Sequence, residues 1–216
     1  MQVESRDSIS LKPAELDEMS QLLVKVGLPI KDETLDVHIE QFPLITLVSV
    51  DDELVGFLFG SLERVGGTPS ILWGLGATRK GRQSRAVIEF ATAELTRRAA
   101  ISFPDEDVLV AGRIAHPGAY TLFAKLTDTV PRPSYEPNGE DRAWGRRLAR
   151  RFSCENRYDE KTFRIKKSGK PEPVLDASTV NAGGAKAAAI VGTVNPVKGE
   201  ALIAFGWVTA GDLANH

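Results

Sequence analysis

The pattern of apolar positions predicts a two-stranded hairpin in the N-terminal half of the chain. Residues 44–50 and 54–62 are apolar runs of strand length, and the acidic pair Asp51 and Asp52 separates them. Runs of this length around a polar pair are typical of antiparallel hairpins. A further apolar run at residues 70–75 has the length of a buried strand. The sequence therefore predicts three strands in close succession.

Three helices are expected around these strands. After Ser84, apolar residues recur at steps of three and four, which predicts a long amphipathic helix. Residues 13–26 show the same periodicity, and Gly27 is suited to end that helix. Asp32 is suited to cap a second N-terminal helix, which Pro43 would end.

The rest of the chain is predicted from shorter patterns. Apolar runs predict strands at residues 8–11, 108–114, 162–165, 187–194 and 201–208. The last two strands flank a turn at 195–199 and are expected to form a C-terminal hairpin. Residues 166–185 are polar and carry several prolines and glycines, which predicts a long flexible loop.

Composition narrows the class of protein. A chain of 216 residues with 42% hydrophobic residues can bury a sizeable core, and a net charge of −2 does not favour nucleic-acid binding by the chain as a whole. The single cysteine, Cys154, fits a reducing compartment. No signal peptide and no membrane-spanning run are recognised, so we expect a cytoplasmic protein that does not bind membranes. The scattered histidines His38, His116 and His216 show no metal-site spacing.

The segment of residues 70–101 carries the clearest chemical signal. Its predicted strand leads into a polar turn at residues 76–83, and the long helix follows from Ser84. The first backbone N–H groups of a helix have no partner within the helix, and its N-terminal end is positive. Because Arg79, Lys80 and Arg82 stand beside this end, the turn is a candidate anion site. The alternative is an ordinary turn with solvated charges.

Taken with the elements predicted around it, this segment resembles the central segment of the GCN5-related N-acetyltransferase superfamily. In that superfamily a strand runs into a turn of the type Arg/Gln-x-x-Gly-x-Gly/Ala and then into a helix. Here the motif can be aligned in two ways, and both keep Gly81. If Arg79 opens the motif, Arg82 and Ser84 stand at the positions of the two small residues. If Lys80 is aligned with the arginine of Arg-Gly-x-Gly, Gln83 stands at the position of the second glycine. The predicted order of strand, two helices, three strands and helix also matches. The resemblance implies an α/β fold with a mixed, mostly antiparallel sheet flanked by helices.

The resemblance also implies a domain organisation. It covers residues 8–126, and we expect the whole chain, residues 1–216, to form one domain with an insertion at about 127–185 and the hairpin at 187–208. The insertion would supply a lid or a surface for the acceptor.

A co-substrate and its binding residues follow from the same resemblance. In the superfamily the strand before the turn separates from its neighbour and pairs with pantetheine, its backbone N–H polarises the thioester carbonyl, and the turn holds the pyrophosphate. Acetyl-CoA or another acyl-CoA is therefore the expected acyl donor, with no metal. Gly74 and Gly76 are compatible with an irregular strand of this kind. The residues expected at the co-substrate are Leu75, Gly76, Ala77, Arg79, Lys80, Gly81, Arg82, Gln83, Ser84 and Arg85.

Candidate catalytic residues are fewer. His116, Pro117 and Ala119 resemble the superfamily's Asn-Pro-x-Ala-x-x-x-Tyr element, in which the tyrosine is thought to protonate the leaving thiolate. Phe123 stands at the position of that tyrosine, and Tyr120, one helical turn earlier, is the remaining candidate acid. His116 and Glu63 are the candidate bases. The alternative for both is structural: a histidine hydrogen-bonded at a loop start, and a solvated charge at a strand end.

A basic segment keeps a second function open. Asp141 is expected to cap a helix in which arginines crowd around Trp144 and Leu148. These arginines either lie in solvent while the apolar residues pack on the domain, or they bind phosphate groups. The resemblance implies an acyltransferase that moves an acetyl or acyl group from acyl-CoA to an amine of a small molecule. The alternative is a non-catalytic or repurposed relative that binds another phosphorylated ligand, a carrier-protein thioester or acyl-tRNA through its basic segments. A homodimer stays open.

Overall fold

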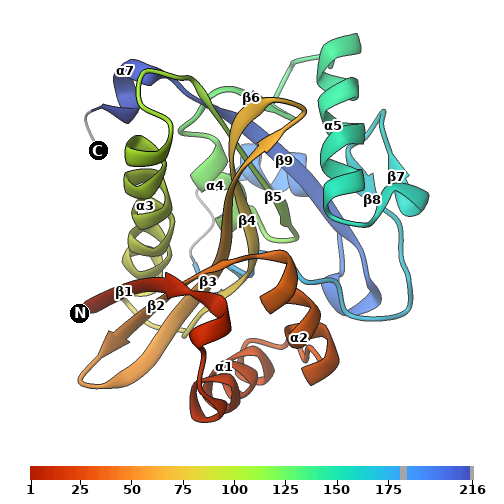
Figure 1. Ribbon diagram of the computed structural model, residues 1–216. Coiled ribbons are helices and arrows are strands. Elements are labelled where there is room, and N and C mark those ends of the chain that lie inside the picture. Colours follow the sequence, from red (N-terminus) through yellow and green to blue (C-terminus); the bar gives the residue numbers. More distant parts are fainter. Residues whose placement is uncertain (181–183, 215–216) are drawn as a thin grey trace.

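The described strands of the protein join one sheet. The computed structural model describes residues 1–180 and 184–214. Eight strands follow one another in the order β1-β2-β3-β4-β5-β9-β8-β7, and β6 pairs with β9 beside this path. Only the β4–β5 pair is parallel among the described strand pairs, and the others are antiparallel. The predicted fold class, a mostly antiparallel mixed sheet flanked by helices, is confirmed (Figure 1).

The N-terminal half follows the predicted order with one correction. Strand β1 (Gln2–Asp7) pairs with β2 (Leu44–Val50), and β2 pairs with β3 (Glu53–Val65) in the expected hairpin. Helices α1 (Pro13–Lys25) and α2 (Asp32–Gln41) lie between β1 and β2 in the chain. The strand predicted at residues 8–11 is wrong, because Ser8–Ser10 form a 3-10 turn (η1) that ends β1.

Helices cover both faces of the sheet. Strand β4 (Thr68–Thr78) leads into α3 (Ser84–Ser102), which packs on β3 and β4. A Cβ at Gly60 of β3 would meet Leu95 of α3 at 2.5 Å, so glycine lets this helix approach the sheet closely. On the opposite face, a Cβ at Gly74 of β4 would meet the ring of Phe42, the residue that follows α2, at 3.0 Å. Strand β4 therefore lies between α2 and α3.

The C-terminal part differs most from its prediction. Strand β5 (Val108–Ile114) is followed by α4 (Pro117–Phe123) and β6 (Thr127–Val130), and then by α5 (Gly139–Arg151), η2 (Glu155–Arg157), β7 (Tyr158–Asp159) and β8 (Arg164–Ile165). The last elements are α6 (Ala185–Val191), η3 (Pro196–Lys198), β9 (Ala201–Val208) and α7 (Ala210–Leu213).

The predicted C-terminal hairpin is wrong. Residues 187–194 were expected to be a strand, but α6 covers most of them. Three consecutive alanines, 187–189, explain the helix, because alanine has the highest helix propensity. Strand β9 is confirmed and pairs instead with β5, β6 and β8. Of the strand predicted at residues 162–165, Arg164 and Ile165 form a strand, β8.

The segment predicted as a flexible loop lies partly in the core. In residues 166–180, the side chains of Glu172, Val174, Leu175, Asp176 and Ala177 are buried. Its polar composition reflects lysines and prolines at its start, whereas its apolar end packs inside the fold. Residues 181–183 of the predicted loop lie outside the described residues. We call residues 172–180 the strap.

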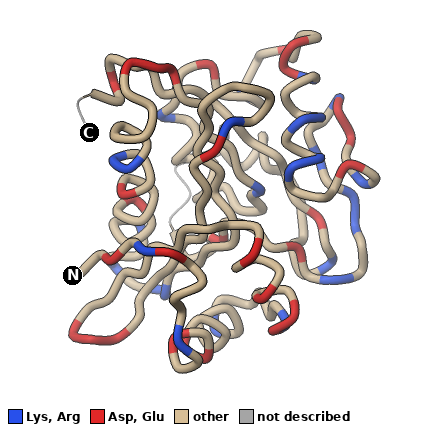
Figure 2. The backbone as a smooth tube through the Cα atoms, in the orientation of Figure 1, with Lys and Arg blue, Asp and Glu red and all other residues tan. Residues whose placement is uncertain are grey.

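The basic helix α5 packs its apolar side chains on the domain and leaves arginines in solvent, which is the first of the two predicted alternatives. In α5 the side chains of Trp144 and Leu148 are buried, while Arg146, Arg147 and Arg150 are exposed. Its N-cap is Asn138, which accepts hydrogen bonds from the N–H groups of Glu140 and Asp141. The prediction that Asp141 caps this helix is therefore wrong. Figure 2 shows basic residues gathered on α5 and the following segment, and acidic residues on α1 and α2. No helix of the described residues is long and apolar enough to cross a membrane.

Candidate functional site

Strands β4 and β5 separate halfway along β4. Their parallel pairing runs from Ser70 with Leu109 to Trp73 with Gly112 and then stops. Strand β4 itself continues to Thr78 and stays paired with β3. Between the Leu58–Gly76 and Gly60–Trp73 pairs, two residues of β4 face one residue of β3, which is a bulge at residues 74–75. The irregular, separating strand that the resemblance implied, and with which Gly74 and Gly76 are compatible, is confirmed.

The strap lies in the gap between the two strands. Leu175 forms parallel bridges to Gly76 of β4 and to Ile114 of β5. The Gly76 N–H donates to the Val174 carbonyl at 3.2 Å, and the Gly76 carbonyl accepts from the Asp176 N–H at 2.7 Å. The Leu175 N–H donates to the Arg113 carbonyl at 2.9 Å. The strap thus satisfies backbone groups that the separation of β4 and β5 would leave without partners.

The far end of the strap reaches the start of α3. The Thr179 hydroxyl donates to the Thr78 carbonyl at 2.9 Å, and the Ser84 hydroxyl lies 3.1 Å from the Thr179 carbonyl. A Cβ at Gly118 of α4 would lie 2.6 Å from the Ala177 carbonyl, so a glycine is needed where α4 meets the strap. Burial of Val174 and Leu175 contributes roughly 1.5–3 kcal/mol for each side chain. The strap is therefore held by backbone hydrogen bonds and by buried apolar side chains.

His38 of α2 lies at the bulge, and the sequence did not indicate it. Its Nε2 accepts a hydrogen bond from the Leu75 N–H at 2.9 Å. The ring is 2% exposed and stacks on Phe42 with 4.6 Å between ring centroids. Burial, with the nearby positive charges of Arg113 and Arg151, holds the pKa of His38 well below its usual value. His38 is therefore a neutral hydrogen-bond acceptor inside the protein.

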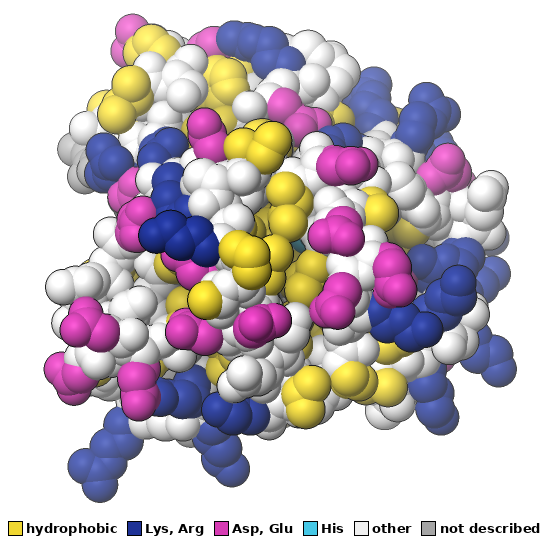
Figure 3. Space-filling model, turned by 60° about the horizontal axis from the view of Figure 1, so that its bottom comes forward, with side chains coloured by type: hydrophobic (Ala, Val, Ile, Leu, Met, Phe, Trp, Pro, Cys, Tyr) yellow, Lys and Arg dark blue, Asp and Glu magenta, His cyan; other side chains and the backbone are white. Residues whose placement is uncertain are grey.

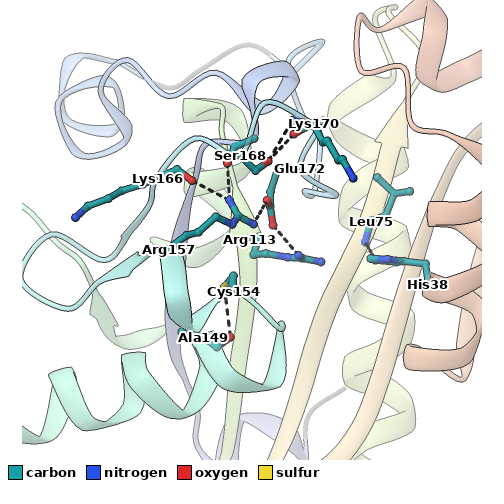
Figure 4. A network of polar contacts seen from close by, with 11 residues as sticks. His38, Leu75, Arg113, Ala149, Cys154, Arg157, Lys166, Ser168, Lys170 and Glu172 are labelled. Carbon is teal, nitrogen blue, oxygen red and sulfur yellow. Dashed lines mark hydrogen bonds and ion pairs between the residues drawn. The ribbon is translucent and has the colours of Figure 1, made fainter.

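A buried ionic network lies next to this histidine. Arg113 of β5 donates to Glu172 at 2.8 Å, and Arg157 donates to the other oxygen of Glu172 at 2.7 Å. Arg113 and Glu172 are 5% and 3% exposed, so the pair is inside the fold. Figure 4 shows Arg113 pointing from its strand toward the side where His38 and Leu75 meet. The network fixes the start of the strap through a charged side chain.

The polar turn before α3 remains on the surface. Lys80, Gly81 and Arg82 are exposed, and a Cβ at Gly81 would meet nothing within 4 Å. Together with Val55 and Val87, the turn lines a shallow cavity of about 320 Å³. Arg79 pairs with Glu53 at 2.7 Å, and Arg85 pairs with Glu89 at 3.2 Å. The turn has room for an anion, with its cations at the rim.

The residues predicted to bind the co-substrate divide into two groups. Arg79, Lys80, Gly81, Arg82 and Gln83 lie together at the open turn, with Arg85 in the first turn of α3. The others are engaged inside the fold: Leu75 with His38, Gly76 and Ser84 with the strap, and Ala77 with β3. The turn therefore fits a phosphate group, but the gap does not admit a pantetheine chain while the strap fills it.

The predicted catalytic residues are not brought together. The Tyr120 hydroxyl donates to the Pro131 carbonyl at 2.9 Å, and burial raises the pKa of Tyr120. Glu63 is partly buried, which raises its pKa, but hydrogen bonds from Arg151 and Ser61 outweigh this and lower it. His116 lies beside the strap, with its Nε2 3.4 Å from Asp176 Oδ2.

These contacts hold two of the predicted residues in other interactions. Glu63 is held in an ion pair, and the Tyr120 hydroxyl is already bonded to the backbone near β6. Cys154 is buried, and this burial raises the pKa of its thiol to about 12. Among the described residues no cluster of three or more histidine, cysteine or acidic side chains could hold a metal ion.

Comparisons with known proteins find similarity to solved structures only. No protein-family model and no curated protein sequence matches the chain. An aminoglycoside 6'-N-acetyltransferase from Enterococcus faecium matches with 16% identity and a TM-score of 0.43, covering 62% of this chain and 68% of that chain. A ribosomal-protein-alanine N-acetyltransferase from Escherichia coli matches with 14% identity and a TM-score of 0.41, covering 64% and 86%.

A third matching structure is described as an acyl-CoA N-acyltransferase from Pseudomonas aeruginosa. It has 16% identity and a TM-score of 0.41, covering 65% of this chain and 94% of that chain. At these identities and TM-scores the three structures show a likeness in fold alone. The geometry of this chain, with β4 and β5 separating in front of α3, is the arrangement implied by the resemblance to the N-acetyltransferase superfamily.

Proposed function

We propose that the protein is an acyl-CoA-dependent N-acyltransferase that transfers an acyl group directly to an amine of a small molecule. The observation that carries the proposal is the separation of β4 from β5 directly before the N-terminus of α3. With the strap displaced, this gap offers β4 as a partner for an extended chain, and the positive helix end at its mouth favours phosphate. Acetyl-CoA is the first donor to test, and it would supply an activated thioester carbonyl.

The open turn is proposed as the phosphate site. The backbone around Gly81 is accessible, and Lys80 and Arg82 lie close to it on the surface. Free N–H groups at the start of α3 favour a negative charge at this position. Gln83 does not prevent this, because it is exposed at the end of the turn. We propose that residues 79–83 hold the pyrophosphate.

Leu75 and His38 are proposed as the acyl-transfer pair. Acyl transfer to an amine needs a donor for the carbonyl oxygen and an acceptor for the amine proton. Here the Leu75 N–H and His38 Nε2 are such a donor and acceptor, and they bond to each other at 2.9 Å. His38 is neutral, as a base must be. We propose that substrates separate this pair: the Leu75 N–H holds the carbonyl oxygen, and His38 Nε2 takes the amine proton. The C–N bond forms as the C–S bond breaks, and the departing thiolate takes up the proton to leave as the free thiol.

The surface near α1 and α2 supports a cationic acceptor. Figure 3 shows a strip of apolar side chains on this end of the molecule, flanked by acidic side chains. Helix α1 contains three acidic residues and α2 contains four: Glu15, Asp17, Glu18, Asp32, Glu33, Asp36 and Glu40. Protonated amines are attracted to a surface of this sign. This surface therefore fits a small amine with an apolar part as the acceptor better than it fits an acidic carrier protein or a tRNA.

The experiment is a calorimetric titration of acetyl-CoA into the parent chain, Gly81→Asp and Gly81→Ala. The added methyl group of Gly81→Ala meets open space, so this variant is the matched control. We expect binding by the parent and the alanine variant, and a loss of at least tenfold with the added negative charge. A panel of small amines then tests for acyl transfer through release of the free thiol. Equal affinity of all three proteins would place the phosphates elsewhere, and no binding would contradict the proposal.

A further inference from the structure

We propose that the strap is a gate that occupies the place of the acyl carrier, and that acyl-CoA binding displaces its residues 174–180. This inference rests on the proposed function. The strap is bound to both Gly76 backbone groups, its N–H and its carbonyl. An extended ligand that pairs with β4 in the gap needs the same two groups. The strap and the ligand therefore exclude each other.

The strap covers the route between the open turn and the acyl-transfer pair. Its Thr179 bonds to the last residue of β4, Thr78, and its carbonyl accepts from Ser84 at the start of α3. From there it runs along β4 to Gly76, next to Leu75. A ligand with phosphates at the turn and a thioester at Leu75 would have to follow this same path.

The two ends of the strap are held differently. At the start, Glu172 is buried between Arg113 and Arg157, and its N–H donates to the Pro196 carbonyl at 2.7 Å. Beyond residue 173, the strap's contacts with β4 and α3 are hydrogen bonds between uncharged groups. Removing a partner from a buried ion pair costs more than breaking a neutral hydrogen bond. Opening is therefore expected from the end at Val180, with Glu172 as the fixed end.

His116 connects the gate to the start of α4. The Nε2 of His116 lies 3.4 Å from Oδ2 of Asp176, and Oδ1 of Asp176 accepts from the Ser178 N–H at 2.8 Å. His116 is thus a contact of the closed gate.

The test follows backbone amide hydrogen exchange with and without acetyl-CoA. In the free protein the amides of Leu175 and Asp176 are bonded to the Arg113 and Gly76 carbonyls and should exchange slowly. With saturating acetyl-CoA we expect their exchange to become at least tenfold faster, while the Gly76 amide stays protected. This readout needs no catalytic activity.

A conservative variant tests the same gate through affinity. Thr179→Val keeps the shape of the side chain and removes the hydrogen bond to Thr78. We expect it to bind acetyl-CoA about three to ten times more tightly, because one hydrogen bond no longer holds the gate closed. Thr96→Val is the matched control, since its hydroxyl bonds only to the Thr92 carbonyl within α3 among the described contacts.

The outcomes separate the two proposals. Binding with faster exchange at Leu175 and Asp176, and tighter binding by Thr179→Val, supports the gate. Binding without a change in their exchange overturns the gate and leaves the proposed function standing. If neither the parent nor Thr179→Val binds acetyl-CoA, both proposals are overturned.

Discussion

The two halves of β4 have different neighbours on their β5 side. From Ser70 to Trp73 the strand pairs with β5, whereas from Gly74 onward β5 has moved away. In this second half, His38 binds the Leu75 N–H and the strap binds both Gly76 backbone groups. The first half is fixed by a regular ladder, while the second is satisfied by groups from other elements. A strand can thus be fully hydrogen-bonded and still have partners that a ligand could replace.

The largest expected effect concerns His38. In His38→Gln the side-chain carbonyl can still accept the Leu75 N–H, but it cannot take a proton. We expect acyl transfer to fall by about 10²–10⁴-fold, the usual contribution of a general base. Steady-state rates with acetyl-CoA and the best amine from the panel check this. A His38→Gln variant that keeps the parent's rate and pH profile would show that His38 only positions the bulge.

The anchor of the strap should dominate stability. Glu172→Gln leaves the buried Arg113 without a carboxylate partner, which should lower the free energy of unfolding by about 3–5 kcal/mol. Urea denaturation measures the change. The matched control is Glu63→Gln, whose partner Arg151 is partly exposed, and it should cost clearly less. Equal losses in the two variants would show that the burial of Glu172 does not determine the loss in the free energy of unfolding.

The buried histidine should also make stability depend on pH. The folded pKa of His38 lies well below its unfolded value of about 6.5, so the unfolded chain binds more protons between the two values. His38 therefore stabilises the fold above about pH 6.5, and this contribution is lost as the pH falls below it, by up to about 1.4 kcal/mol per pH unit.

A difference between two variants isolates this effect. His38→Gln should flatten the change in the free energy of unfolding from about pH 6.5 to 5. Phe42→Leu removes the ring stacked on His38 but keeps the titrating group, so it should lower stability while retaining the slope. An unchanged slope in His38→Gln would assign the pH dependence to other groups.

The smallest expected effect is on the basic face of α5. Arg146 and Arg147 are exposed, and Arg146 pairs with Glu160 on the surface. Reversing both charges should change acetyl-CoA affinity by less than about fivefold, as is usual for exposed charges. The same calorimetric titration checks this. A large loss would show that α5 takes part in phosphate binding and that the open turn is not the whole site.

The pattern of apolar residues predicted best the strands and the helix whose apolar side chains form the core. The apolar runs of β2, β3, β4 and β5 and the periodicity of α3 all form the expected elements. The strand predicted at 187–194 failed because a short alanine-rich run does not distinguish strand from helix. The strap was missed because its polar start suggested a loop, and burial of residues 174–177 depends on the gap in the sheet.

Only part of the proposed site is visible in the sequence. The turn at residues 79–83 follows from a strand, a helix start and nearby cations, all visible in the sequence. His38 could not be recognised, because its partner Leu75 is far away in the sequence and the bulge that aims the N–H depends on the register with β3. A histidine among acidic residues on an N-terminal helix gives no signal of a contact with a strand.

The most direct test compares the two halves of β4 in one experiment. Acetyl-CoA is titrated into the isotope-labelled parent chain, and the backbone amide resonances of β4 are followed by NMR. We expect shifts at Leu75 and Gly76, where the partners can be replaced, and little change at Leu72 and Trp73, which pair with β5. Binding that leaves Leu75 and Gly76 unchanged, or no binding at all, would contradict the claim that the gap between β4 and β5 is the acyl-CoA site.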